Sequence, residues 1–206
     1  MRSVVVVLAL VACAVGARAQ EWRALGTFDE ATVETMTSSS APVRVRASRQ
    51  LPLGCEPVMA TLKDIPSFSK WIDFSGWDVV ADERAHGGVI TMHGRHAMPF
   101  PFSPRDYVVD YAATTTADTF TLVATSTQKG PAVANGTVRL RVRSSWSLQL
   151  NPEPIATSKT CLVSYEYDGD LGGSFPHFLL EGAFKHEGPR LLAAVLAEAR
   201  KRGTKP

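Results

Sequence analysis

Residues 138–150 read VRLRVRSSWSLQL, and apolar and polar side chains alternate along most of this stretch. Successive side chains of a β-strand point to opposite faces, so the alternation gives one apolar face and one polar face. The apolar face carries Val138, Leu140, Val142, Trp146, Leu148 and Leu150, opposite Arg139, Arg141, Arg143 and Gln149. The pattern therefore predicts a long strand that is buried on one side only.

Similar alternation occurs in shorter segments on both sides of this stretch, namely 77–82, 89–98, 106–112, 119–126 and 161–167. An earlier segment, 43–50, predicts one further strand. Strands with one solvated face are typical of antiparallel sheets, because parallel strands are usually buried on both faces. The sequence therefore predicts a large antiparallel sheet.

The hydrophobic period changes near the C-terminus, where apolar residues recur at helical spacing between Phe178 and Ala199. Three cations follow at residues 200–202, and positive charge at this end suits the helix dipole. Gly188 and Pro189 interrupt the helix. Because the proline removes one backbone hydrogen bond, we expect a kink there.

Two short helical segments are expected before the main run of strands, one over 55–64 and one turn around Phe68, Trp71 and Ile72. The order of strand, short helices, six strands and long helix indicates an α+β domain. One long helix can cover the apolar face of a curved sheet, but the sheet is long for a single helix to fill. We therefore expect an internal cavity between the sheet and the helix.

The N-terminus has the pattern of an export signal. Arg2 precedes an apolar run from Val4 to Val15, which is shorter than the ~20 residues that span a bilayer. Ala17-Arg18-Ala19 has the small-x-small form of a cleavage site, so 1–19 is interpreted as a cleaved signal peptide and 20–206 as a single domain. A short N-terminal anchor is one alternative, and a lipoprotein anchored through Cys13 is another.

The net charge depends on this processing. The full chain of 206 residues has 22 Lys+Arg and 20 Asp+Glu. Arg2 and Arg18 are the charged residues of 1–19, so the remaining chain has 22 − 2 = 20 basic and 20 acidic residues. A domain with no net charge lacks the basic excess that broad binding to nucleic acid requires.

Several local motifs occur in a particular order along about 22–200. They are Leu62, Asp64 and Trp71; Met98-Pro-Phe-Pro; Ser103-Pro-Arg-Asp-Tyr-Val108; Trp146; and Asp168-Gly-Asp-Leu-Gly-Gly-Ser-Phe-Pro-His-Phe-Leu179. This series resembles the START (steroidogenic-acute-regulatory-related lipid transfer) domain of the helix-grip superfamily. The resemblance implies a curved antiparallel sheet of about seven to nine strands wrapped around the C-terminal helix. It also implies a hydrophobic tunnel that holds one lipid, with no catalytic residue and no cofactor.

The chain departs from the family at one point. In the cholesterol carriers of the family, an acidic residue and an arginine lie deep in the tunnel. The matching positions here, by spacing from Arg105, are near Met92 and Tyr111, so the charged pair is absent. Cholesterol is therefore not carried over as the expected ligand, and the sequence leaves sterols, phospholipids and fatty acids open.

Alternation and the resemblance together predict which side chains contact the ligand. A filled core is the alternative for each of them, because apolar inward faces are usually core. Tyr107, Tyr111 and His96 could hold a polar group of the ligand. The full predicted set is Met92, His96, Tyr107, Tyr111, Phe120, Leu122, Leu140, Val142, Trp146, Tyr165, Phe178, Phe184, Leu191, Leu192 and Val195.

A gate is predicted from two elements. The segment 127–137 is a long loop with an apolar middle at Gly130, Pro131, Ala132 and Val133, which would cover the tunnel or touch a membrane transiently. An ordinary hairpin loop is the alternative. Gly188 and Pro189 would let the C-terminal helix swing, and we expect loop and helix to open together.

Other polar groups carry weaker patterns. His93 and His96 are three residues apart on a predicted strand, so they point to opposite faces and are not expected to bind a metal. Asp106 and Asp110 share a face, but that face is the solvated one, so solvation is expected rather than acid–base chemistry.

Two cysteines, Cys55 and Cys161, remain after the expected processing. In the arrangement that the resemblance implies, the first and last strands are antiparallel neighbours, which brings both cysteines to one end of the sheet. An exported protein can hold such a pair as a disulfide, and two separate buried thiols are the alternative. A bridge would close a loop of about 106 residues and stabilise the fold by roughly 3–5 kcal/mol.

The sequence therefore predicts an exported, monomeric lipid-binding or lipid-transfer protein, with the bacterial periplasm as the expected compartment. An enzyme of the same superfamily is the first alternative, a cyclase or hydrolase-like protein with His96 or a tyrosine as its acid–base group. A ligand-sensing module that reports to a partner is the second. No nucleic-acid partner, metal or cofactor is expected.

Overall fold

The computed structural model describes residues 21–38, 41–98, 100–150, 159–170, 172 and 177–203. Its strands form one ten-stranded, mostly antiparallel sheet in the order β1-β2-β3-β10-β9-β7-β6-β5-β4, with β8 paired to β6. The strands are β1 (Arg23–Phe28), β2 (Ala31–Ser38), β3 (Ala41–Leu51), β4 (Gly76–Asp82), β5 (Ile90–His96), β6 (Arg105–Thr115), β7 (Thr119–Ser126), β8 (Val138–Arg139), β9 (Arg141–Gln149) and β10 (Cys161–Asp170). The helices are α1 (Cys55–Lys63), η1 (Ile65–Lys70), η2 (Arg84–His86) and α2 (His177–Gly203).

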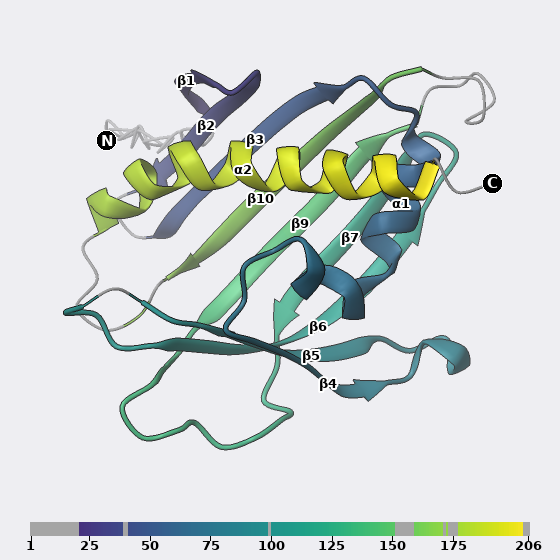
Figure 1. The fold of residues 1–206 in the computed structure, drawn as a ribbon. Helices are drawn as coiled ribbons and strands as arrows, with labels where there is room; N and C mark the ends of the chain where they lie inside the picture. Colours follow the sequence, from purple (N-terminus) through teal and green to yellow (C-terminus); the bar gives the residue numbers. More distant parts are fainter. Residues whose placement is uncertain are drawn as a thin grey trace, which may run out of the picture.

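The long helix α2 crosses one face of the curved sheet, and its C-terminal end lies next to α1 (Figure 1). This is the predicted α+β arrangement, and the predicted strand and helix positions are close to the observed ones. Side chains from the inner face of the sheet pack with α1, η1 and α2 into one hydrophobic core. Phe68, Phe120 and Leu192 are among its largest buried members.

The sheet has ten strands, more than the predicted seven to nine, because the hairpin of β1 and β2 adds two strands and the stretch 138–150 forms both β8 and β9. Asp29 and Glu30 form the two-residue turn of the hairpin, with φ values of 46° and 65°. Such turns usually carry Asn-Gly or Asp-Gly, because glycine adopts positive φ without strain. Because Asp29 and Glu30 occupy the turn, the sequence lacks the glycine signal that normally predicts a hairpin. The hairpin pairs with β3 and extends the sheet at that edge.

The stretch 138–150, predicted as one long strand, forms two strands, β8 and β9. Leu140 lies between β8 and β9, and its backbone N–H donates to the carbonyl of Asp106 at 2.8 Å. This bond holds β8 beside β6, where it makes a short parallel pair, while β9 turns to pair with β7 and β10. Alternation continues through the break, so the sequence pattern does not reveal it.

The C-terminal helix α2 continues through Gly188 and Pro189 without ending there, and the kink expected at Pro189 stays a prediction. Both Gly188 and Pro189 are buried. A Cβ placed on Gly188 would lie 2.7 Å from the Cβ of Ala47 in β3. The glycine therefore allows close contact between helix and sheet, and packing holds the helix together at the proline.

Cys55 and Cys161 form a disulfide in the structure, with their Cα atoms 4.8 Å apart. Both cysteines are buried, and the bridge joins the start of α1 to the start of β10. In the sheet, Cys161 lies opposite Leu51, the last residue of β3. The first and last predicted strands are therefore antiparallel neighbours, as the resemblance implied.

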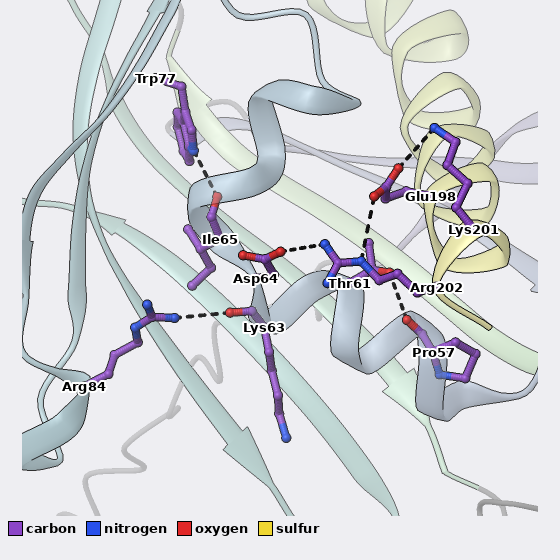
Figure 2. Close-up of polar contacts among 10 residues, drawn as sticks. All are labelled: Pro57, Thr61, Lys63, Asp64, Ile65, Trp77, Arg84, Glu198, Lys201 and Arg202. Carbon is purple, nitrogen blue, oxygen red and sulfur yellow. Dashed lines mark hydrogen bonds and ion pairs between the residues drawn. The ribbon is translucent and has the colours of Figure 1, made fainter. Parts of the chain in front are cut away.

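A polar network fixes the C-terminal end of α2 to the junction of α1 and η1, as Figure 2 shows. The Arg202 guanidinium donates to Asp64 Oδ2 at 2.6 Å and lies 3.8 Å from Glu198 Oε1. Burial alone raises the pKa of Asp64, but hydrogen bonds from Arg202 and Ser67 outweigh it and hold the pKa below its ordinary value. On the other side of Asp64, the Trp77 indole N–H donates to the Ile65 carbonyl at 2.9 Å and ties η1 to β4.

Candidate functional site

A pocket of about 280 Å³ lies between the inner face of the sheet and the N-terminal half of α2. Its walls come from β5, β6, β7, β9 and β10, from the segment around η1, and from α2. The predicted ligand-contacting residues that line it are His96, Tyr107, Tyr111, Leu140, Val142, Trp146, Tyr165, Phe184 and Leu191. Alternation along the strands and helical spacing in α2 thus bring these side chains together.

Other predicted residues belong to the packed core instead. Met92, Phe120, Leu122, Leu192 and Val195 are fully buried and do not line the pocket. They belong to the hydrophobic core, where α1 contacts β7, β9 and α2, so the same inward face serves partly as pocket wall and partly as core. The alternation of side chains along a strand does not distinguish residues that line the pocket from residues of the packed core. The Phe178 side chain lies outside the described residues.

Several lining residues were missed: Phe68, Ile72, Phe74, Met98, Arg105, Val109, Ala124, Ser144, Tyr167, Ala183 and Glu187. Arg105, Val109, Ser144 and Tyr167 share the inward parity of their strands, so a strict reading of the alternation would have included them. Phe68, Ile72 and Phe74 lie in and after a short helical turn, where no period exists to assign a face.

Neutral hydroxyl and imidazole groups make up much of the polar lining. His96 Nε2 lies 3.4 Å from the Tyr107 hydroxyl oxygen. Burial lowers the pKa of His96, although Glu187 nearby acts in the opposite direction. Burial also raises the pKa of Tyr107 and Tyr111 and raises the pKa of Tyr165 to about 12. At neutral pH the imidazole is therefore uncharged and the phenols are protonated.

Two charged side chains, Glu187 and Arg105, line the pocket. Glu187 of α2 is half exposed, and both of its carboxylate oxygens accept from the Arg190 guanidinium, at 2.8 and 2.7 Å. Arg105 is buried at the start of β6 and donates to the carbonyl oxygens of Ser103 and Gly172. We call the exposed side of the pocket near Glu187 and His96 the mouth. Its ionic groups are engaged with protein partners, which leaves the interior predominantly apolar.

The predicted gate residues do not line the pocket. Gly130 lies over Val108, since a Cβ on this glycine would be 3.0 Å from a methyl group of that valine. Val108 alternates with Tyr107 and Val109, which face the pocket, so Gly130 lies on the opposite side of the sheet. Ala132 and Val133 are exposed. A gating role for this loop stays a prediction.

Asp106 and Asp110 were expected to be solvated, but Asp106 is buried beneath the same loop. Its carboxylate accepts from Arg139 Nε at 2.8 Å and lies 3.1 Å from His93 Nε2, while Arg139 also donates to the Pro131 carbonyl at 3.0 Å. Burial raises the pKa of Asp106, but the hydrogen bonds from Arg139 and His93 outweigh it and lower the pKa. This cluster fastens the loop to the outer face and is separate from the pocket.

The part of the chain that the structure describes contains neither a candidate metal site nor a helix that could span a membrane. There, no group of three or more histidine, cysteine or acidic side chains could hold a metal ion. Within the same residues, no helix is both long and apolar enough to cross a membrane.

Comparison with solved structures identifies the fold. A STAR-related lipid transfer protein from Xanthomonas axonopodis superposes with a TM-score of 0.72 at 19% identity, covering 87% of this chain and 98% of that one. Human StAR-related lipid transfer protein 5 gives 0.72 at 17% identity, with 88% of each chain covered. The Zhui aromatase/cyclase of a Streptomyces species gives 0.51 at 12% identity, covering 78% and 94%.

No family model and no curated protein sequence matches the chain. The chain has the helix-grip fold of START domains, in agreement with the motifs quoted from its sequence. Identities below 20% carry this likeness to the two lipid transfer proteins, so it extends to the architecture and not to any particular ligand.

Proposed function

We propose that the protein binds one hydrophobic ligand in the pocket between sheet and α2 and transfers it between membranes or partners. The observation that carries this proposal is the pocket itself, whose walls are mostly apolar and aromatic side chains. Burying an apolar ligand gains roughly 25 cal/mol per Å² of surface removed from water, so such walls bind without strong polar anchors. The shared fold with lipid transfer proteins supports the same reading.

Membrane contact is proposed at the mouth, through the segment between β5 and β6. Phe100 in this segment is 97% exposed, and Met98 and Arg105 on either side of it line the pocket. An exposed aromatic side chain next to a ligand pocket is suited to the interfacial layer of a bilayer. A ligand could then pass from membrane to pocket without crossing much water.

Ligand access is proposed to require movement of the N-terminal half of α2. This half contributes Ala183, Phe184, Glu187 and Leu191 to the pocket wall. Its displacement would open the wall, whereas the C-terminal half is held by Arg202 and by the core. We also propose that the protein acts outside the cytoplasm, since the N-terminal pattern and the disulfide both suit export.

Native mass spectrometry of the protein purified under mild conditions tests the binding proposal, followed by extraction and identification of any bound molecule. We expect a mass increase of one small apolar ligand that disappears on denaturation. A transfer assay between donor and acceptor vesicles tests transport, and Phe100→Ser should slow transfer while leaving bound ligand in place. A protein that stays empty and ignores vesicle lipids would contradict the proposal.

A helix-grip enzyme is the second candidate, and the pair of His96 and Tyr107 favours it. A neutral imidazole 3.4 Å from a phenol inside an apolar pocket can serve as acid–base partner for a ring-forming reaction. Conversion of a bound ligand into a product of different structure, lost in His96→Gln, would favour this function. Release of the ligand unchanged would favour transfer.

A further inference from the structure

Aromatic rings form two continuous walls of the pocket. On one side, Tyr165 of β10 stacks on Phe184 of α2 with centroids 6.0 Å apart and planes 14° apart. Trp146 of β9 follows at 4.7 Å from Tyr165. This wall runs from the helix onto the sheet as one set of contacting rings, and each of its three members lines the pocket.

The second wall begins at η1 and ends at β6. Phe74 stacks on Trp77 at 4.4 Å with planes 9° apart, and Phe74 lies 4.9 Å from the His96 ring. His96 in turn stacks on Tyr107 at 5.7 Å with planes 26° apart. Phe68 lies 6.1 Å from Trp77, nearly parallel to it. Trp77 does not line the pocket itself, but it contacts Phe68 and Phe74, which do.

Ring walls of this kind are stiff. An aromatic side chain has two rotatable bonds, and each ring here is held by its neighbours, so reshaping one requires moving several. A flat ligand can stack on preformed ring faces and gains about 0.5–1.5 kcal/mol per pair beyond the burial of area. A flexible chain gains less from flat walls, because it loses rotamer freedom when confined between them.

The volume limits the size of the ligand. An apolar cavity of ~150 Å³ accommodates benzene. The 280 Å³ pocket therefore has room for about two fused rings. Two acyl chains, or the four fused rings of a sterol, would extend out through the mouth or require these walls to move apart.

The polar lining limits the charge of the ligand. The imidazole of His96 is neutral, and the hydroxyl groups of Tyr107 and Tyr165 are protonated. These groups match a hydroxyl, which can accept from a phenol or donate to an imidazole, or a keto oxygen, which can accept from a phenol. Glu187, the acidic group of the lining, is already paired with Arg190, and Arg105, its basic group, already donates to the carbonyl oxygens of Ser103 and Gly172.

We infer that the pocket selects a flat, uncharged ring compound of about two fused rings that carries one hydroxyl or keto oxygen near His96 and Tyr107. This inference rests on the proposed function, because it names the ligand class of the same pocket. The ring system would lie between the walls of Trp146–Tyr165–Phe184 and Phe68–Phe74–His96, with its oxygen toward the mouth.

Isothermal titration calorimetry with four probes tests the inference: 2-naphthol, 1-decanol, decanoic acid and palmitoyl-oleoyl phosphatidylcholine vesicles. We expect 2-naphthol to bind about tenfold more tightly than 1-decanol, because the naphthol rings can form two stacked pairs with the aromatic walls and 1-decanol can form none. Tyr165→Leu, which removes a ring at similar size, should abolish this preference. Tyr107→Phe, which removes only the hydroxyl, should weaken 2-naphthol about three- to tenfold. Leu148→Met, at a fully buried core residue that does not line the pocket, is the aliphatic control and should change neither value appreciably.

The outcomes separate this inference from the proposed function. If 1-decanol or decanoic acid binds as tightly as 2-naphthol, or if the vesicle lipid alone binds, the ring selectivity is wrong while ligand binding by the pocket stands. If none of the four probes binds the folded wild-type protein, both are contradicted. A preference for 2-naphthol that survives Tyr165→Leu would place the compound outside the ring walls and would also overturn the inference.

Discussion

The two halves of α2 meet the rest of the molecule differently. From Leu192 to Arg202, the helix sits on α1 and the sheet, with Leu192, Val195 and Ala199 fully buried and Arg202 paired with Asp64. In the preceding turns, the helix faces the pocket, and its residues Phe184 and Leu191 are walls of an unfilled space. Gly188 and Ala47 mark the close contact of this pocket half with β3.

The comparison indicates that one half of α2 stabilises the fold and the other half contacts the ligand. Apolar burial, the ion pair and the nearby disulfide stabilise the C-terminal half, which we call the anchored half. The pocket half lacks packing partners where the pocket lies, and unfilled volume forfeits dispersion contacts and stability. A bound ligand would supply those contacts. The predictions below perturb one half and use the other as the reference.

The largest effect is expected from the disulfide beneath the anchored half. Replacing both cysteines, in Cys55→Ser with Cys161→Ser, should lower the free energy of unfolding by roughly 3–5 kcal/mol, because the bridge closes a loop with a sequence separation of 106. Urea titration of the variant, beside reduced and oxidised wild type, measures this. A loss below about 1 kcal/mol would show that the bridge does not constrain the unfolded chain as assumed.

Adjacent leucines provide a matched pair. Leu192→Ala removes a fully buried core side chain of the anchored half and should cost about 2–5 kcal/mol of stability. Leu191→Ala truncates a pocket wall, where packing is already incomplete, and should cost about half as much while weakening ligand binding. Thermal and urea unfolding of both variants give the comparison. Equal costs would mean that the pocket half is packed as tightly as the anchored half.

Gly188→Ala tests the close contact between α2 and the sheet. The added Cβ would lie 2.7 Å from the Cβ of Ala47 and 2.9 Å from a ring carbon of Phe184. We expect a loss of about 1–2 kcal/mol, because overpacking outweighs the higher helix propensity of alanine. Urea unfolding measures it, with the exposed Ala193→Gly in the next turn as control for propensity alone. A stabilised Gly188→Ala variant would contradict the close contact.

The smallest effect is expected from the ion pair of the anchored half. Asp64→Asn should cost below about 1 kcal/mol at neutral pH, since both side chains are partly solvated. The pKa of Asp64 is lowered in the fold, so its contribution is present above the pKa of the unfolded state and is lost as pH falls through the folded pKa.

Wild type and Asp64→Asn should therefore converge in stability at acidic pH. Arg190→Ala, which removes an exposed pair of the pocket half, is the control and should change stability less. A difference between wild type and Asp64→Asn that grows on acidification would contradict the assigned sign.

Much of the fold follows from the sequence because each main strand keeps its alternation and the helix keeps its period. The exceptions have physical causes. The Asp29-Glu30 turn adopts positive φ without glycine, and Pro189 is tolerated where Gly188 lets the helix touch Ala47. Neither depends on a pattern that can be read along the chain.

The pocket could be predicted only in part. Alternation along the strands correctly placed Tyr107 and Trp146 in the pocket, but it equally selected Phe120 and Leu122 of β7, a strand that α1 contacts and whose two side chains are fully buried in the core. A side chain on the inner face of the sheet belongs to the core if a helix packs on it and lines the pocket if none does, and this depends on where the helices begin and end. That information lies in the packing of distant segments and not in the local sequence.

Hydrogen–deuterium exchange of α2, measured with and without 2-naphthol or vesicle lipid, tests most directly whether the pocket half is the ligand-responsive part of an otherwise anchored helix. Without ligand, amides of 182–190 should exchange faster than those of 192–202, since local opening follows the density of buried contacts. Ligand should slow exchange in 182–190 and in β9 and β10, and leave 192–202 unchanged. Equal exchange in both halves, unaltered by any ligand, would contradict the division of α2 and the assignment of the pocket.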